Sequence, residues 1–166
     1  MDAGLKEQLA KIKLLLMDVD GVLTDGGLYY SENGDEMKKF HVRDGLGIKL
    51  VQQAGIAVGF VTGMKSSLVA RRAKTLGIEE VVQGCTVKEP VVDALIARMG
   101  LSWEEVAYIG DDLIDVGVMR QAGFAAAVAD AAEATRHAAH HVTSLPGGRG
   151  AVREVCDLLL HARQSD

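Results

Sequence analysis

The chain has 166 residues and a formal net charge of −5, and 48% of its residues are hydrophobic. This length suits one domain with its own hydrophobic core, residues 1–166. An acidic chain lacks the clustered lysines and arginines that bind nucleic acids, so we expect no nucleic-acid partner. No apolar run approaches the length of a membrane span, so we expect no membrane partner.

The first residues and the cysteines indicate the compartment. Met1–Lys13 carries mixed charges without the apolar core of a signal peptide, and we expect this segment to be frayed. Cys85 and Cys156 are far apart and form no CxxC pair, which is typical of a reducing compartment. We therefore expect a cytoplasmic protein.

The first third of the chain predicts a strand, a hairpin and a helix. The apolar run in 11–17 is typical of a strand that is buried on both faces of a sheet. Residues 28–30 and 37–42 flank Asn33-Gly34, a sequence that favours a tight turn between two strands. Asp44 is expected to cap a helix over 45–54.

The remainder of the chain alternates between strands and helices. We expect strands at 56–61, 81–82, 106–109, 124–128 and 141–142. We expect helices at 66–76, 90–99, 112–121, 131–138 and 151–162. Such alternation predicts an α/β fold in which helices cover both faces of a parallel sheet.

Polar side chains follow four of the expected strands, and ligands bind such sheets at the carboxyl ends of the strands. They are Asp18, Asp20, Thr62, Lys88, Asp111, Asp112 and Asp115, and Gly63 adds a backbone amide. Gathered carboxylates repel one another unless a cation neutralises them, and oxygen ligands favour Mg²⁺ over zinc. Carboxylates, a hard cation and a cationic cradle together indicate phosphoryl transfer.

The Asp18-x-Asp20 spacing supports a covalent mechanism. Residues i and i+2 of an extended segment point to the same side. Asp18 can then attack phosphorus while Asp20 reaches the leaving oxygen. An aspartyl-phosphate intermediate divides one difficult displacement into two easier ones.

Four motifs in order resemble those of the haloacid dehalogenase superfamily of phosphatases: Asp18-Val19-Asp20-Gly21-Val22-Leu23-Thr24, Thr62, Lys88 and Gly110-Asp111-Asp112-Leu113-Ile114-Asp115. The segments 41–45 and 147–154 also resemble the 3-deoxy-D-manno-octulosonate 8-phosphate (KDO 8-phosphate) phosphatases. The resemblance covers residues 11 to 160. It implies a Rossmann-like three-layer α/β/α phosphatase without a cap domain, with a hairpin flap at about 26–42 and a C-terminal tail at about 144–166.

The resemblance also implies roles for single residues. Asp18 would be the nucleophile and a Mg²⁺ ligand, and Asp111 a further ligand. Asp20 would bind Mg²⁺ through its carbonyl and serve as general acid and then general base. Thr62, Gly63 and Lys88 would hold the phosphoryl group. Positions that contact the sugar acid in the family correspond here to Asp20, His41, Val42, Arg43, Asp44, Gly45, Lys49, Met64, Arg72 and Lys88.

Met64 departs from the family pattern, because arginine usually follows the Thr-Gly pair. The absence of this arginine removes a possible bidentate partner for the substrate carboxylate. The resemblance implies hydrolysis of KDO 8-phosphate in lipopolysaccharide biosynthesis, by a homotetramer in which Arg149 helps to close a site. Met64 leaves a nonulosonate 9-phosphate open as the substrate.

Simpler interpretations stand beside these. Asp112 and Asp115, which the resemblance assigns to tuning or orienting the site, could instead be an ordinary first-turn carboxylate and a loop-holding group. Arg43 and Arg72 could form surface ion pairs. A catalytically dead assembly domain would often lack the nucleophile, and Asp18 is present here. His137, His140 and His141 form a short group without nearby carboxylates or cysteines, for which we expect no metal.

Overall fold

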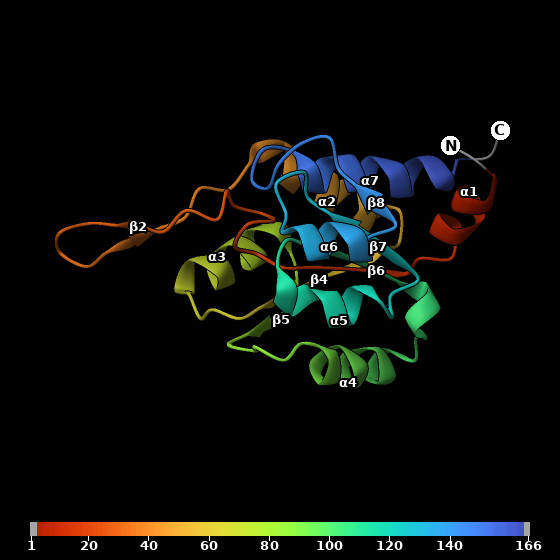
Figure 1. The fold of residues 1–166 in the computed structure, drawn as a ribbon, viewed down its shortest axis with the longest axis horizontal. Helices are drawn as coiled ribbons and strands as arrows, with labels where there is room; N and C mark the ends of the chain where they lie inside the picture. The colour runs from red at the N-terminus through yellow and green to blue at the C-terminus, as the bar shows by residue number, and fades with distance from the viewer. Residues whose placement is uncertain (1–2, 165–166) are drawn as a thin grey trace.

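The computed structural model describes residues 3–164 and contains a six-stranded parallel sheet (Figure 1). Its strands are β1 (Leu14–Met17), β4 (Ala57–Thr62), β5 (Glu80–Gln83), β6 (Val106–Gly110), β7 (Phe124–Ala127) and β8 (His141–Val142). Their order across the sheet is β5-β4-β1-β6-β7-β8. The chain thus winds in both directions away from the central β1, and the carboxyl end of β1 is the place where such sheets bind ligands.

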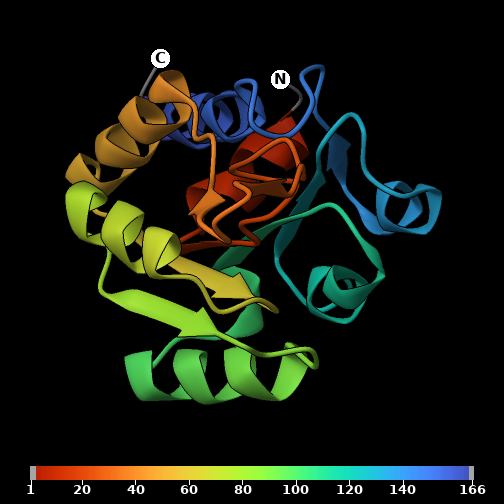
Figure 2. The same cartoon turned by 90° about the vertical axis from the view of Figure 1, so that its left-hand side faces the viewer.

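Helices cover both faces of the sheet, which confirms the α/β/α prediction. They are α1 (Ala3–Ala10), α2 (Val42–Gln53), α3 (Ser67–Leu76), α4 (Glu89–Met99), α5 (Val116–Met119), α6 (Glu133–Ala138) and α7 (Ala151–Ala162). Figure 2 shows α2, α3 and α7 on one side of the sheet and α4, α5 and α6 on the other. α2 packs along α7, and α1 contacts the same helix.

The central strands are buried on both faces, as the apolar run predicts. All four residues of β1 are fully buried, and so are those of β7, where three alanines let the helices approach closely. Met17 lies opposite Phe60 on one side and Ile109 on the other. This register brings the ends of β1, β4 and β6 to one edge of the sheet.

The hairpin is shorter than predicted. β2 (Tyr29–Tyr30) pairs with β3 (Glu36–Met37), whereas the sequence predicts a second strand over 37–42. That strand ends early because residues 38–41 lead directly into α2. Gly34 closes the turn with a φ of +85°, a conformation that glycine adopts without strain. The hairpin projects away from the body of the molecule (Figure 1).

Two expectations near the start of the chain are wrong. Residues 3–10 form α1 instead of a frayed segment, because Leu9 is fully buried in the core. Asp44 does not cap α2, since the helix begins at Val42 and His41 occupies the N-cap position. Asp44 is buried in the first turn, where it accepts a hydrogen bond from the Arg153 N–H at 2.9 Å.

The helix predicted over 112–121 is also divided. Asp112 caps a 3₁₀ turn (Leu113–Asp115), and a single α-helical segment, α5, follows it. The Asp112 carboxylate accepts from the Leu113 N–H at 2.7 Å, and the Asp115 side chain bonds back to the Asp112 N–H at 3.2 Å. This reciprocal capping turns the Asp115 side chain toward the end of β6.

Candidate active site

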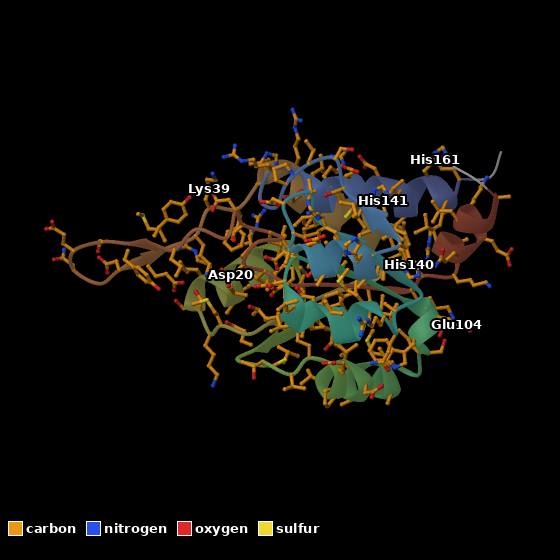
Figure 3. The ribbon with its side chains drawn as sticks, viewed as in Figure 1. Asp20, Lys39, Glu104, His140, His141 and His161 are labelled. Carbon is orange, nitrogen blue, oxygen red and sulfur yellow. The ribbon has the colours of Figure 1, made fainter. Side chains whose placement is uncertain are left out.

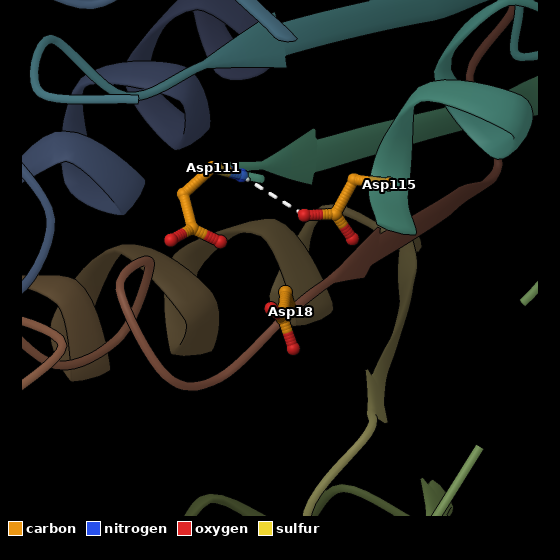
Figure 4. A group of neighbouring side chains, drawn as sticks. All are labelled: Asp18, Asp111 and Asp115. Carbon is orange, nitrogen blue, oxygen red and sulfur yellow. Dashed lines mark hydrogen bonds between the residues drawn. The ribbon is translucent and has the colours of Figure 1, made fainter. Parts of the chain in front are cut away.

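Three carboxylates meet at the carboxyl edge of the sheet (Figure 4). Asp18 follows β1, Asp111 follows β6, and Asp115 ends the 3₁₀ turn. One oxygen from each lies within 4.8 Å of the others. This is the one group with the composition of a metal site among residues 3–164. A hard cation fits it, because three nearby carboxylates offer only oxygen ligands.

Asp115 organises the site through both of its oxygens. Oδ2 accepts from the N–H groups of Asp111 at 3.0 Å and Asp112 at 3.2 Å. Oδ1 accepts from the Tyr108 hydroxyl and from Lys88 Nζ, each at 2.7 Å. The carboxylate therefore holds the loop after β6, as the simpler interpretation predicts, and it also contacts Lys88, which lies beside Asp18.

Lys88 is fully buried beside the nucleophile candidate. It immediately precedes α4, and its Nζ lies 3.1 Å from Asp18 Oδ1 and 2.7 Å from Asp115 Oδ1. The Tyr108 hydroxyl lies 3.2 Å from the same nitrogen. A buried ammonium is costly unless it is paired, and here two carboxylates pair with it. Tyr108 was not identified from the sequence. Its only indication there is one hydroxyl group within an apolar strand.

Asp18 is 5% exposed and held in place from two directions. Its N–H donates to Ile109 O at 3.0 Å, and its Oδ1 accepts from the Val19 N–H at 2.7 Å. Lys88 contacts the same oxygen. The Val19 N–H and the Lys88 ammonium group thus both contact Oδ1.

The crowded carboxylates hold protons more tightly than isolated ones. Burial and the charge of Asp18 raise the pKa of Asp111 to about 8. Burial raises the pKa of Asp18 to about 6, against the opposing attraction of Lys88. Asp111 Oδ1 is also buried without a hydrogen-bond partner among the described residues. Both observations fit a site whose charge is completed by a cation.

The loop after β1 is packed tightly against two other segments. A Cβ on Gly21, where φ is +90°, would lie 2.0 Å from Asp111 Oδ2. A Cβ on Gly147 would lie 1.7 Å from Gly21 O, and the Gly148 N–H donates to Val22 O at 2.9 Å. The Gly-Gly-Arg-Gly segment is therefore packed against the first motif instead of being a loose loop. Arg149 is exposed at this position.

Asp20 lies beside the carboxylate group but has a different partner. Its Oδ1 forms an ion pair with Lys38, a residue of the hairpin base that sequence reasoning missed. Thr62 is buried at the end of β4, with its Oγ1 3.4 Å from the Met64 N–H. Gly63 lies between them, and the Met64 side chain is exposed at the rim.

The predicted sugar-acid contacts form a second group. Arg72, on α3, lies over the Phe40 ring at 5.5 Å, and its Nη2 is 3.5 Å from His41 O. A Cβ on Gly45 would lie 2.5 Å from the same guanidinium nitrogen. Among residues 3–164, no hydrogen bond or ion pair joins this group to Asp18, Asp111 or Lys88.

Other members of that prediction are exposed or lie at the far end of α3. Val42 is 84% exposed, and Arg43 is also exposed. Lys49 Nζ lies 3.3 Å from the position of a Cβ on Gly77, at the C-terminal end of α3. A helix of ten residues spans about 15 Å. Since the N-terminal end of α3 follows the carboxyl end of β4, Lys49 lies at the far end of the helix from that edge.

The histidines form no metal group among the described residues. His140 Nδ1 accepts from the Ala125 N–H at 2.9 Å, and its ring stacks on Phe124. His141 Nε2 lies 3.2 Å from Glu154 Oε1. Figure 3 shows both near β7 and β8. They support the edge of the sheet.

The parallel sheet and the carboxylate-lysine site define a haloacid dehalogenase-like hydrolase, and a family model with that description matches residues 77–150. The chain is 48% identical over 157 residues to the 3-deoxy-D-manno-octulosonate 8-phosphate phosphatase KdsC of Yersinia pestis, covering 95% of this chain and 84% of the relative. The chain belongs to the KDO 8-phosphate phosphatase family, as its motifs indicate.

Solved structures agree with this assignment. The KDO 8-phosphate phosphatase of Moraxella catarrhalis, in complex with a magnesium ion, a phosphate ion and KDO, is 42% identical with a TM-score of 0.95. The alignment covers 98% of this chain and 93% of that one. A cobalt-bound phosphatase of this kind from Haemophilus influenzae is 44% identical, covers 94% and 91% of the two chains, and has a TM-score of 0.90.

Proposed function

We propose that this chain is a Mg²⁺-dependent phosphatase that hydrolyses 3-deoxy-D-manno-octulosonate 8-phosphate to KDO and inorganic phosphate, in lipopolysaccharide biosynthesis. The observation that carries this proposal is the buried Asp18–Lys88–Asp115 group beside Asp111, in a chain so similar to KdsC. The whole chain serves as one phosphatase domain. Its two free cysteines accord with a cytoplasmic enzyme. No helix among the described residues has the length and apolar character needed to cross a membrane.

In the first step, an oxygen of Asp18 attacks phosphorus. The bond between phosphorus and the sugar oxygen breaks, and that oxygen takes a proton from the Asp20 carboxyl group. Lys88 offers its charge to the phosphoryl oxygens while it holds Asp18 Oδ1 at 3.1 Å. Thr62 and the Gly63 N–H provide further donors at the same edge.

In the second step, water attacks the phosphorus of the aspartyl phosphate. Asp20, now a carboxylate, accepts a proton from that water as the bond between phosphorus and Asp18 breaks. Inorganic phosphate leaves, Asp18 is a carboxylate again, and Asp20 again carries its proton. Asp18, Asp111 and the Asp20 carbonyl would hold Mg²⁺, which neutralises the carboxylates and polarises the phosphoryl group when bound.

A substrate panel tests the proposal. KDO 8-phosphate, a nonulosonate 9-phosphate and a simple hexose phosphate are assayed with Mg²⁺. The eight-carbon acid should have the highest kcat/KM, by about tenfold or more, since one extra carbon unit in a fitted site changes the free energy by about 1–3 kcal/mol. Faster turnover of the nine-carbon acid would instead support the alternative that Met64 left open.

We further propose that the enzyme forms a homo-oligomer, most simply a homotetramer. The hairpin stands away from the body, and its Leu28, Tyr29, Tyr30 and Met37 side chains are exposed. An exposed apolar group of this kind usually marks an interface. Phe40 does not belong to it, because it is half-buried under Arg72. The Arg72 group, separate from Asp18 within one chain, would meet the active site of a neighbouring subunit.

Substitution at the hairpin tests the assembly. Tyr30→Glu places a charge in the apolar surface and should convert the oligomer to monomers, because loss of an interface aromatic costs about 2 kcal/mol or more. Activity should fall with it, mainly through KM. Tyr30→Phe is the matched control and should keep both. Sedimentation velocity alongside the assay decides, and a fully active monomer would contradict the shared site.

A further inference from the structure

Lys38 links the hairpin base to the acid-base candidate. Its side chain is only 2% exposed, although its neighbours Met37 and Lys39 are exposed, and its Nζ pairs with Asp20 Oδ1. The motifs described above do not include this lysine. Lysine side chains are rarely buried unless they are paired with an opposite charge. This position raises the question of what the contact does for Asp20.

A second set of contacts fixes Lys38 to the body of the protein. Glu36 Oε1 lies 3.2 Å from Lys38 Nζ, and Glu36 Oε2 accepts from the Ser66 hydroxyl at 3.1 Å. Ser66 caps α3, and its N–H donates to Gln83 Oε1 at 2.7 Å. Through Glu36 and Ser66, the lysine is thereby connected to α3 and β5.

The two oxygens of Asp20 have different surroundings. Oδ1 faces the Lys38 ammonium group, whereas Oδ2 is buried and has no hydrogen-bond partner among residues 3–164. An ammonium group can only donate, so a proton on the Asp20 carboxyl group belongs on Oδ2. The contact therefore fixes the orientation of the Asp20 carboxyl group and leaves Oδ2 as the oxygen that no described residue occupies.

We propose that Lys38 is a positioning residue that orients Asp20 for proton transfer, with Glu36 and Ser66 holding the lysine in place. This inference rests on the proposed function, in which Asp20 protonates the sugar oxygen and then deprotonates water. Loss of the orientation should slow each step in which Asp20 moves a proton. It should leave unaffected a first step whose leaving group needs no proton.

The test compares two leaving groups in the Lys38→Met enzyme. With KDO 8-phosphate, whose alkoxide needs a proton, kcat should fall about 100-fold, the lower part of the range for general acid-base catalysis. With p-nitrophenyl phosphate, the first-turnover burst of nitrophenolate should stay within about threefold of wild type, while the later steady rate falls. Lys38→Arg keeps the cation and should recover part of the loss.

Lys39→Met is the matched control. Lys39 is the neighbouring lysine, is 53% exposed, and pairs with Asp25 at 2.9 Å, not with Asp20 (Figure 3). Its substitution should leave both rates unchanged. An equal loss of burst and sugar-phosphate turnover in Lys38→Met would overturn the inference. So would full activity in that variant.

A variant that fails to fold and an inactive wild-type protein are two separate outcomes. If Lys38→Met does not fold, Glu36→Gln carries the test, since it keeps Lys38 but weakens its anchor. A smaller loss confined to the proton-dependent rates supports the inference, and a uniform loss or none overturns it. If wild-type protein does not hydrolyse KDO 8-phosphate, the proposed function fails, and the same comparison on a hexose phosphate still tests Lys38.

Discussion

Asp18→Asn should abolish turnover, with kcat falling by about 10³-fold or more, while the fold remains intact. The amide has nearly the shape of the carboxylate but lacks the charged oxygen that attacks phosphorus. An amide oxygen can keep the contacts that Lys88 and the Val19 N–H make with Oδ1. The rest of the site should therefore stay in place while the nucleophile is lost. Steady-state assays with KDO 8-phosphate measure the effect.

The control for this prediction is Asp157→Asn. Asp157 is an exposed acid on α7 that pairs with Arg153 at 2.8 Å, and its loss should leave the rate unchanged. Circular dichroism and thermal melting should show both variants folded. Near-normal activity in a folded Asp18→Asn enzyme would exclude Asp18 as the nucleophile.

Removal of the metal has the second large effect. Exhaustive chelation should lower turnover about a thousandfold, since a bound ion contributes several kcal/mol at the phosphoryl group. Mg²⁺ should restore it, and Co²⁺ or Mn²⁺ should restore part, because oxygen ligands select weakly among such ions. Full activity after chelation would contradict the metal assignment.

The metal-free protein should also lose stability as pH rises. The folded-state pKa values of about 6 for Asp18 and about 8 for Asp111 lie above the ordinary value of 3.8. Between about pH 4 and about pH 8 the folded state binds more protons than the unfolded state. The free energy of unfolding therefore falls as pH increases over this range. Below about pH 4 both states are protonated and the penalty is absent.

Asp111→Asn separates this effect from the titration of other groups. Without metal, the variant should be more stable than wild type at pH 8 and differ little from it at pH 4. Mg²⁺ should raise the melting temperature of wild type and leave that of the variant nearly unchanged. A difference between the two proteins that does not depend on pH would contradict the crowding of carboxylates.

Much of the fold follows from local patterns. Short apolar runs such as 14–17 favour buried strands, and their alternation with helices predicts a parallel sheet. The errors have tertiary causes. Asp44 has the side chain of a cap, yet it is drawn into the interior by the Arg153 N–H of α7, more than a hundred residues away. Residues 3–10 are helical because Leu9 finds a place in the core.

Some residues of the site could also be predicted from local patterns, and others could not. Asp18, Lys88 and Asp111 could be named from motifs, because strand ends gather at one edge whatever the details of packing. Tyr108 and Lys38 carry no such signal, since their roles come from contacts across the fold. The Arg72 group was predicted beside the substrate, and among residues 3–164 no hydrogen bond or ion pair joins it to Asp18. In the proposed homotetramer, a neighbouring subunit would bring this group to the substrate.

Rapid-quench trapping of the phosphoenzyme tests the central mechanism most directly. The enzyme is mixed with KDO 8-phosphate and Mg²⁺, quenched in acid within one turnover, digested, and examined by mass spectrometry. We expect one phosphoryl group on Asp18 of the wild-type enzyme. With p-nitrophenyl phosphate, whose leaving group needs no proton, we expect a higher level in Asp20→Asn, where the second step lacks its base. A phosphoryl group on another residue, or none in either enzyme at times when product forms, would contradict covalent catalysis by Asp18.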